Sequence, residues 1–392
     1  MERRTLLIGS AVAGAQLRGA NDRIRAAIIG AGSRGTYHIA QFKEVGAEVA
    51  AVCDVYEPHL RQGLEEASTR AKGYDNHKRL LEDKSVDVVV IATPDHTHAP
   101  IAIDAVNAGK DVYVEKPMSH TIEDGFRLIE AARATKRVVQ VGTQRRSFDL
   151  YQEAKRIMSS GALGEVRLVT SWWLNHWKGL RGGGVEGKLD WQQWLGPAPK
   201  RPLDATRFHG WEYFWDYAGG HLTAQGAHLI DAIHWMMNST FPTAVTCAGG
   251  RPNLEGAEVP ETASMTIEYP ENYLAVFTIR YKAMKYKPFK DQMKQFHGSK
   301  ARFDLARESY ALFPQSSAID MKPSVEKRNP GSFESATRAH IRNFLDCVRS
   351  RNDPNATVEM GQYTAVVLAL AVESLRTGRR VKFNTAQKRM EV

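Results

Sequence analysis

Short apolar runs alternate with amphipathic segments along the first third of the chain. Five runs rich in β-branched residues lie at residues 26–30, 49–54, 86–93, 112–115 and 138–142. The segments between them carry apolar residues at helical spacing. Strands that alternate with helices are typical of a parallel sheet wrapped by helices. The pattern therefore predicts an N-terminal α/β domain over residues 22–146.

The pattern changes after residue 146, where one more helix, at residues 149–159, is expected. Strand-like runs then dominate, at residues 166–173, 243–249, 262–269, 273–281, 292–297 and 301–305. The later runs follow one another without helices, which indicates antiparallel pairing. We expect a second α/β domain over residues 147–334, with a large, open, mainly antiparallel sheet.

Three helical segments and one long connection complete the pattern. Helices are predicted at residues 225–237, 335–349 and 358–376, and residues 335–392 are expected to pack back on the first domain. Residues 174–215 are rich in Gly, Pro and Trp. A connection of this length is expected to cover a site.

Composition narrows the classes of protein. The chain has 392 residues, 43% hydrophobic and 25% charged, and a net charge of +9. No run approaches the 18 or so apolar residues of a membrane span, so no stable membrane insertion is expected. The basic residues are scattered, which argues against nucleic acid and fits an anionic cofactor better. Three distant cysteines predict buried thiols, with neither a disulfide framework nor a metal site.

Residues 1–21 form a distinct leader. Arg3 and Arg4 precede a short apolar segment, and Ala13-Gly14-Ala15 offers a site for signal cleavage. This arrangement resembles a twin-arginine export signal. It predicts a periplasmic or extracytoplasmic protein; the alternative is a cytoplasmic protein with a disordered leader.

A glycine-rich turn follows the first strand and opens a helix. It reads Gly30-Ala31-Gly32-Ser33-Arg34-Gly35, and amides at such a helix N-terminus hold a pyrophosphate. Asp54 ends the second strand, about 20 residues on, where a carboxylate accepts ribose hydroxyls. These residues predict an NAD site, with NADP disfavoured because Asp54 would repel its 2′-phosphate. The alternative is a glycine turn without a nucleotide.

Lys116 ends a later strand of the same domain, within Glu115-Lys116-Pro117. This position puts the lysine beside the bound dinucleotide, where a lysine of lowered pKa can act as a base. Glu115 is expected to contact the nicotinamide ribose or to orient Lys116. Thr93, Pro94 and His98 follow the third strand at the same edge. Either His98 polarises the cofactor edge, or the turn from Asp95 to His98 has a helix-capping role.

Several ordered motifs support a family resemblance over residues 22–385. They are Thr93-Pro94-Asp95-His96-Thr97-His98, Glu115-Lys116-Pro117, Gly142-Thr143-Gln144-Arg145-Arg146, Gly219-Gly220, His228-Leu229-Ile230-Asp231 and His340-Ile341-Arg342-Asn343-Phe344-Leu345-Asp346. With these motifs the chain resembles the Gfo/Idh/MocA family of oxidoreductases. The resemblance implies a Rossmann domain with bound NAD(P), a C-terminal α/β domain with an open sheet, and redox chemistry at a sugar or polyol hydroxyl. It also implies a homodimer or homotetramer assembled through that sheet.

One position departs from the family pattern. The family places an acidic residue four positions before the histidine of the later motif, and here Ala224 precedes His228. Lys116 and His228 are therefore the retained catalytic pair. Either Asp216, Asp231 or a water supplies the missing polarity, or the reaction differs from simple alcohol oxidation.

All eight tryptophans lie between residues 172 and 235. Aromatic faces stack on the C–H faces of sugars, although core packing is the alternative for most of them. The candidate substrate contacts are Trp173, Asn175, His176 and Trp177, with Arg145, Arg146, Asp216 and Tyr217 as polar partners.

Three functions remain open. The first is an NAD-dependent oxidoreductase acting on a sugar or polyol. The second is an NAD-dependent glycoside hydrolase that works by transient oxidation, elimination and re-reduction. The third is a sugar- or nucleotide-sensing protein without turnover. The sequence does not distinguish the sugar or the carbon oxidised.

Overall fold

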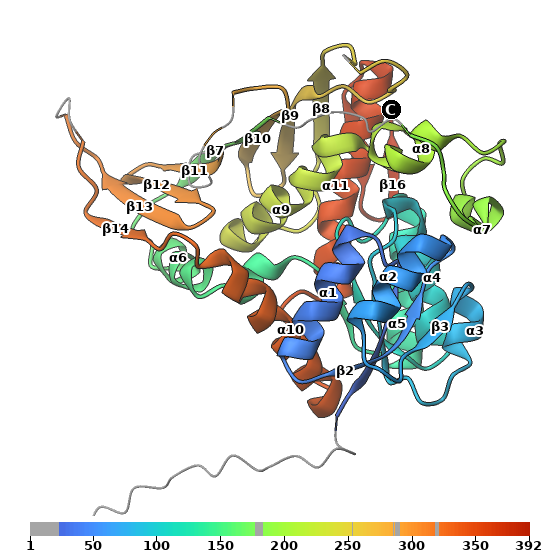
Figure 1. Cartoon of the computed structure of the whole chain (residues 1–392). Coiled ribbons are helices and arrows are strands. Elements are labelled where there is room, and N and C mark those ends of the chain that lie inside the picture. Colours follow the sequence, from blue (N-terminus) through green and yellow to red (C-terminus); the bar gives the residue numbers. More distant parts are fainter. Residues whose placement is uncertain (1–22, 177–182, 253, 285, 287–290, 318–320) are drawn as a thin grey trace, which may run out of the picture.

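Two sheets organise the chain (Figure 1). The computed structural model describes residues 23–176, 183–252, 254–284, 286, 291–317 and 321–392. The expected export leader and Trp177 lie outside the described residues. The first sheet has six strands in the order β3-β2-β1-β4-β5-β6, all paired in parallel, and the second has ten. The predicted fold class is confirmed.

The first sheet is buried on both faces. Its strands are β1 (Arg25–Ile29), β2 (Glu48–Cys53), β3 (Lys72–Tyr74), β4 (Val88–Ile91), β5 (Asp111–Val114) and β6 (Val139–Val141). Its helices are α1 (Ser33–Glu44), α2 (Glu57–Glu66), α3 (His77–Leu81), α4 (Asp95–Asn107) and α5 (Ile122–Thr135). Side chains alternate along each strand, so Ala27 and Ile29 pack with α4 and α5. Ala26 and Ile28 pack on the other face with α1.

The C-terminal helix α10 (Phe333–Ser350) completes that second face. Ile341, Phe344 and Leu345 share one buried cluster with Ile28 and Phe42 of the first domain. In Figure 1 this helix runs beside α1. Residues far apart in sequence thus build a single Rossmann core.

The second sheet has the order β14-β13-β12-β11-β7-β10-β9-β8-β15-β16. Only the β7–β10 pair is parallel. The strands are β7 (Val166–Leu174), β8 (Ala244–Gly249), β9 (Thr262–Tyr269), β10 (Tyr273–Arg280), β11 (Gln292–Gly298), β12 (Ala301–Ala306), β13 (Ser309–Pro314), β14 (Val325–Arg328), β15 (Val381–Asn384) and β16 (Arg389–Glu391). The mainly antiparallel sheet expected from the sequence is therefore present.

Five short strands, at the sheet edges or next to an edge strand, were not predicted from the sequence. They are β3, β13, β14, β15 and β16. The charged β14 shows the reason: its residues read Val-Glu-Lys-Arg and are mostly exposed. An edge strand with little buried apolar surface lacks the alternation on which a sequence-based prediction depends. Backbone pairing with a neighbouring strand decides its conformation.

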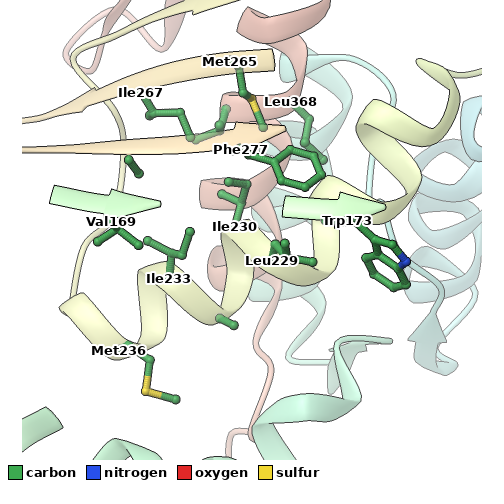
Figure 2. Close-up of a cluster of buried hydrophobic side chains, with 14 of the residues drawn as sticks. Val169, Trp173, Leu229, Ile230, Ile233, Met236, Met265, Ile267, Phe277 and Leu368 are labelled. Atoms are coloured by element: carbon green, nitrogen blue, oxygen red, sulfur yellow. The ribbon is translucent and has the colours of Figure 1, made fainter. Parts of the chain in front are cut away.

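Helix α9 (Gly220–Met237) covers one face of the second sheet together with α6 (Asp149–Ser159) and α11 (Val358–Thr377). Figure 2 shows Leu229, Ile230 and Ile233 of α9 interleaved with strand side chains such as Val169 and Phe277.

The start of α9 corrects the sequence-based prediction, which placed it at residue 225. A Cβ on Gly219 would lie 2.8 Å from Cγ2 of Val372. Gly219 therefore lets the start of α9 approach α11 closely. Glycine is a poor helix former, so intrinsic propensity placed the boundary too late.

Helix α11 is also the one described helix long and apolar enough to cross a membrane by length and composition. Of its apolar window, 61% is buried inside the protein, where it packs on α5, α9 and β8. Such burial is what a core helix of a globular domain requires.

The described part of the 174–215 connection folds against the end of β2. It contains α7 (Trp191–Leu195), α8 (Ala205–His209) and the 3₁₀ turn η3 (Trp211–Tyr213). Leu189 pairs with Tyr56, just after β2, and the Asp190 N–H donates to the Val55 carbonyl at 2.9 Å. Trp191 and Trp194 stack at 4.6 Å between ring centroids and lie in one buried cluster with Tyr56. This segment therefore borders the Asp54 end of the Rossmann sheet, and these two tryptophans serve packing.

Candidate active site

Lys116 meets helix α9 at the carboxyl end of β5. Its Nζ donates a hydrogen bond of 3.1 Å to the carbonyl oxygen of Ala224. His228 follows one helical turn later on the same helix. The Lys116–Pro117 peptide bond is cis. The structure thus brings the two predicted catalytic residues together near Ala224. Ala224 is the position that differs from the family pattern.

The Glu115 carboxylate is hydrogen-bonded to three groups, one of them the Lys116 N–H. Its Oε1 accepts hydrogen bonds from Arg34 Nε at 2.6 Å and from His38 Nε2 at 2.7 Å, and its Oε2 accepts from the Lys116 N–H at 3.1 Å. Burial alone would raise the pKa of the Glu115 carboxyl, but the charge of Arg34 and the His38 hydrogen bond hold that pKa well below its ordinary value. Glu115 is a buried anion that links the glycine-rich turn to Lys116. This geometry supports the orienting role expected from the sequence.

The surroundings of the Lys116 amine lower its pKa. Burial lowers the pKa of Lys116 below its ordinary value of 10.5, against the opposing charges of Glu115 and Asp95. Desolvation disfavours the ammonium form. A neutral amine at moderate pH is what a general base requires.

The carboxylates proposed to replace the family acid are committed elsewhere. Asp231 is buried in an ion pair of 2.8 Å with Arg146, and Asp216 pairs with Arg201 and with Arg207. Instead, Asp95 is the carboxyl group outside the Glu115 network whose charge acts most strongly on Lys116. Sequence analysis placed Asp95 in a turn with a helix-capping alternative and did not connect it with Lys116. One feature of the sequence could have pointed to Asp95 as a site residue. It directly follows Thr93-Pro94, at the edge where the parallel strands end.

The glycine-rich turn fits a dinucleotide. Gly30 has φ +87°, and a Cβ there would lie 2.8 Å from the backbone of Ala92. A Cβ on Gly35 would lie 1.9 Å from the Gly30 carbonyl oxygen, whereas one on Gly32 would meet only the His59 ring, at 3.6 Å. Helix α1 begins without a side-chain cap or an acidic residue in its first turn. Its first amides, at Ser33 and Arg34, are therefore suited to an anionic group.

Asp54 and Arg34 favour NAD over NADP. Asp54 accepts hydrogen bonds from the Ala31 N–H at 2.7 Å and the Tyr56 N–H at 2.9 Å. A carboxylate offers about four lone-pair sites, so acceptor capacity remains for ribose hydroxyls. The Arg34 guanidinium is engaged by Glu115 at 2.6 Å and does not offer a counter-charge to a 2′-phosphate.

His98 has a structural position. Its Nδ1 lies 2.7 Å from the Pro117 carbonyl oxygen and its Nε2 lies 2.8 Å from that of Thr93. The N-cap of α4 is Pro94, and no side-chain hydrogen bond caps this helix. The capping alternative is therefore wrong; His98 ties the segment after β4 to the segment after Lys116.

His228 and Trp173 form the wall on the sheet side. Their ring centroids lie 6.0 Å apart. Burial, and then the charges of Lys116 and Arg145, hold the pKa of His228 well below its ordinary value, so the ring is neutral. Among the described residues, neither His228 Nδ1 nor Trp173 Nε1 has a hydrogen-bond partner. Buried polar atoms of this kind are usually satisfied by water or by a ligand.

The polar partners expected for the substrate are corrected by their burial. Arg145 is 1% exposed and donates to the His228 carbonyl at 3.3 Å, so it supports the helix that carries the histidine. Arg146 is held by Asp231, and Tyr217 is fully buried against Trp194. Sequence reasoning could not separate these residues from true contacts, because arginine and tyrosine are usual both in sites and in buried networks.

Two further candidates lie just after β7. The Asn175 N–H donates to the Arg280 carbonyl at 3.0 Å, and Asn175 Oδ1 accepts from the His176 N–H at 2.7 Å. His176 is exposed and pairs with Lys282. They continue the strand that carries Trp173 and are compatible with a substrate contact.

Comparison with known sequences defines the class of protein. The Gfo/Idh/MocA profile described as "Oxidoreductase family, NAD-binding Rossmann fold" matches residues 24–143. The profile described as "Oxidoreductase family, C-terminal alpha/beta domain" matches residues 185–383. The chain therefore belongs to the Gfo/Idh/MocA oxidoreductase family, and its first domain is the NAD-binding domain of that family.

Individual relatives match to different extents. Inositol 2-dehydrogenase of Salmonella paratyphi B is 37% identical over 149 residues, 37% of this chain and 44% of that protein. Inositol 2-dehydrogenase 2 of Saccharopolyspora erythraea is 27% identical over 361 residues, 90% of this chain and 93% of that protein. Glycosyl hydrolase family 109 protein 1 of Shewanella sp. (strain MR-4) is 32% identical over 123 residues, 29% of this chain and 27% of that protein. The first of these alignments spans less than half of the relative it matches.

Solved structures share the fold. Levoglucosan dehydrogenase, in complex with NADH and L-sorbose, superimposes with a TM-score of 0.73 at 17% sequence identity, over 92% of this chain and 98% of that chain.

Proposed function

We propose that this protein is an NAD-dependent dehydrogenase that oxidises a hydroxyl group of a sugar or polyol. The observation that carries the proposal is the contact between the Lys116 amine and α9, one turn before His228, at the edge where the strands of the NAD-binding domain end. In open α/β sheets this edge is where ligands bind. The dehydrogenase names of the relatives support the same substrate class.

Different side chains accept the proton, contact the substrate and hold the cofactor. When bound, the oxidised nicotinamide supplies a hydride acceptor. Neutral Lys116 accepts the hydroxyl proton as the substrate carbon loses hydride, and Glu115 holds the lysine in place. His228 and Trp173 offer ring nitrogens without a described protein partner to substrate hydroxyls or water. Ser33, Arg34 and Asp54 would hold the pyrophosphate and the adenosine ribose.

The Lys116→Met variant tests the base. Its side chain has similar volume and no ionisable group, so NAD affinity should stay near that of the natural protein. The rate of NADH formation should fall by roughly 10²–10⁴, the range for a lost general base. A panel of polyols and anhydrosugars with NAD, followed by NADH absorbance, makes the measurement. Full turnover of Lys116→Met on the best substrate would exclude the lysine as the base.

A glycoside hydrolase is the second candidate, because of Ala224. Because the family acid is absent, the reaction need not be simple alcohol oxidation. A hydrolase that oxidises its substrate transiently and then returns the hydride releases no NADH. The partial match to a glycosyl hydrolase of family 109 favours the same candidate. Release of aglycone from a glycoside without net NADH formation would identify this reaction. Binding of sugar and NAD with neither product would indicate the sensing protein.

A further inference from the structure

A buried carboxyl group follows β4, the strand that pairs with β5, and Lys116 follows β5. Asp95 is in the first turn of α4 and only 6% exposed. Its turn is held rigidly: the next residue, His96, donates its N–H to the Tyr217 carbonyl at 3.1 Å, and its ring lies 3.1 Å from the Trp194 carbonyl. These contacts fix the position of the Asp95 backbone. Lys116 is the cation whose charge has the largest effect on the pKa of Asp95.

A cavity opens on the same carboxyl group. Its volume is about 210 Å³, and it lies between the starts of α5 and α9 and one side of α11. Its lining includes Asp95, Pro117, His120 and Thr223. Pro117 follows Lys116 in the chain, and Thr223 precedes Ala224, whose carbonyl holds the lysine. The cavity therefore reaches the back of the site, and its size admits several waters.

We propose that Asp95 takes from Lys116 the proton that the substrate hydroxyl releases and passes it to water in this cavity. The inference rests on the proposed dehydrogenase function. Oxidation of an alcohol by NAD sends a hydride, with its electron pair, to the nicotinamide and leaves one proton on Lys116. That ammonium proton moves through water to the Asp95 carboxylate, which restores the neutral amine. The Asp95 carboxyl group then releases the proton to water, so each turnover exports one proton.

The charges around Asp95 suit a carboxyl group that gains and loses a proton in each turnover. Burial raises the pKa of Asp95 to about 7, and the Lys116 charge opposes this while Glu212 and Glu115 add to it. A carboxyl group with a pKa near neutrality can both accept and release a proton in each cycle. On the cavity side, His120 is kept neutral by burial, and Glu373 and Arg376 line the wall towards α11. Asp124, Asp216 and Arg376 are the charges that act on His120.

The first test compares Asp95→Asn with Asp104→Asn. Asp104 lies on the same helix, away from the cavity, with a half-exposed side chain paired to His77. In Asp95→Asn the first reduction of bound NAD should proceed, and steady turnover should fall by roughly 10²-fold, the lower end of the range for a lost proton-transfer group. The solvent deuterium isotope effect on kcat should grow, and the isotope effect of substrate C–H deuteration should shrink. Asp104→Asn should behave as the natural protein.

The second test blocks the cavity and leaves the carboxyl group in place. Ala369 of α11 lines the cavity, and Ala369→Leu should fill part of it and slow steady turnover with the same isotope signature. Unchanged turnover in Asp95→Asn, or loss of turnover with no growth of the solvent isotope effect, would overturn the proposal. Unchanged isotope effects in a folded Ala369→Leu protein would overturn the route through the cavity. If the natural protein formed no NADH from any polyol, the dehydrogenase function would fail instead, which is a distinguishable outcome.

Discussion

Glu115 and Lys116 show how adjacent residues acquire opposite functions at the residue scale. The Glu115 side chain turns back into the domain, where Arg34 and His38 keep it ionised. The Lys116 side chain faces α9, where burial favours the neutral amine. One residue becomes a fixed anchor and the next a base. The activity should therefore rise with pH through a Lys116 pKa below the ordinary value for lysine.

Asp95 makes the stability depend on pH. Its folded-state pKa of about 7 lies above the ordinary value of 3.8, so folding favours the protonated form. This contribution to stability is complete below pH 4 and is lost as the pH rises through 7. Asp95→Asn should therefore raise the free energy of unfolding at pH 8 relative to the natural protein, by at most about 4 kcal/mol (three pH units at about 1.36 kcal/mol each).

Urea unfolding at pH 4 and pH 8 measures this difference. Asp104→Asn, on the exposed side of the same helix, is the control. A gain for Asp95→Asn that is equal at both pH values would contradict the titration of this group.

The start of α9 is decisive at the scale of elements. Gly219 lets the helix start close to α11, and α9 carries Ala224, whose carbonyl accepts from Lys116, and His228 one turn later. The α9 segment after the glycines is strongly apolar and packs under the second sheet together with side chains of α6 and α11. The glycines thus contribute to the site through the position of the helix.

Gly219→Val should destabilise the protein by about 1–3 kcal/mol, the usual cost of overpacking, and should reduce turnover. The new Cβ would lie 2.3 Å from Cγ2 of Thr223 and 2.8 Å from Cγ2 of Val372. Gly250→Val is the matched control, because a Cβ there meets only the Thr262 carbonyl oxygen, at 4.0 Å. Thermal unfolding and kcat for both variants test the argument. Equal effects at the two glycines would show that the close approach to α11 is unimportant.

The second sheet presents an open face at the scale of the whole molecule. Leu168 of β7 and Leu274 of β10 are register partners and are 37% and 43% exposed. Adjacent exposed apolar side chains on a sheet are typical of an interface. This supports the homodimer or homotetramer that the family resemblance led us to expect.

Leu274→Lys should shift the assembly towards the monomer, because it places a charge in the exposed leucine pair. Light scattering after size-exclusion chromatography gives the mass. Leu203→Lys, at a position 52% exposed and outside the sheets, is the control. A monomeric natural protein would contradict the proposal directly.

Export of the whole protein is a proposal that rests on Arg3 and Arg4 in the leader. The twin-arginine route carries folded proteins, so an NAD-loaded enzyme could be exported intact. The double variant Arg3→Lys, Arg4→Lys should keep the full-length protein in the cytoplasm, as measured by fractionation. Unaltered export would exclude this pathway.

The sequence by itself determined the two-domain α/β class, the NAD site and the candidate pair Lys116 and His228. Repeating apolar runs specify buried parallel strands, and the glycine turn, Asp54 and Lys116 sit at strand ends whose place in such a sheet follows from the topology. Long, strongly periodic strands and helices were therefore predictable to within a few residues.

Only the tertiary structure decided which polar residues are buried in packing and ion pairs. Arg146 and Tyr217 had suitable chemistry but are buried in packing and ion pairs, whereas Asp95 lines a cavity and carries a charge that acts on Lys116. Edge strands and the start of α9 likewise depended on partners distant in sequence. The physical reason is common to all of them: burial and proximity arise from contacts between distant segments, and local sequence carries little record of those contacts.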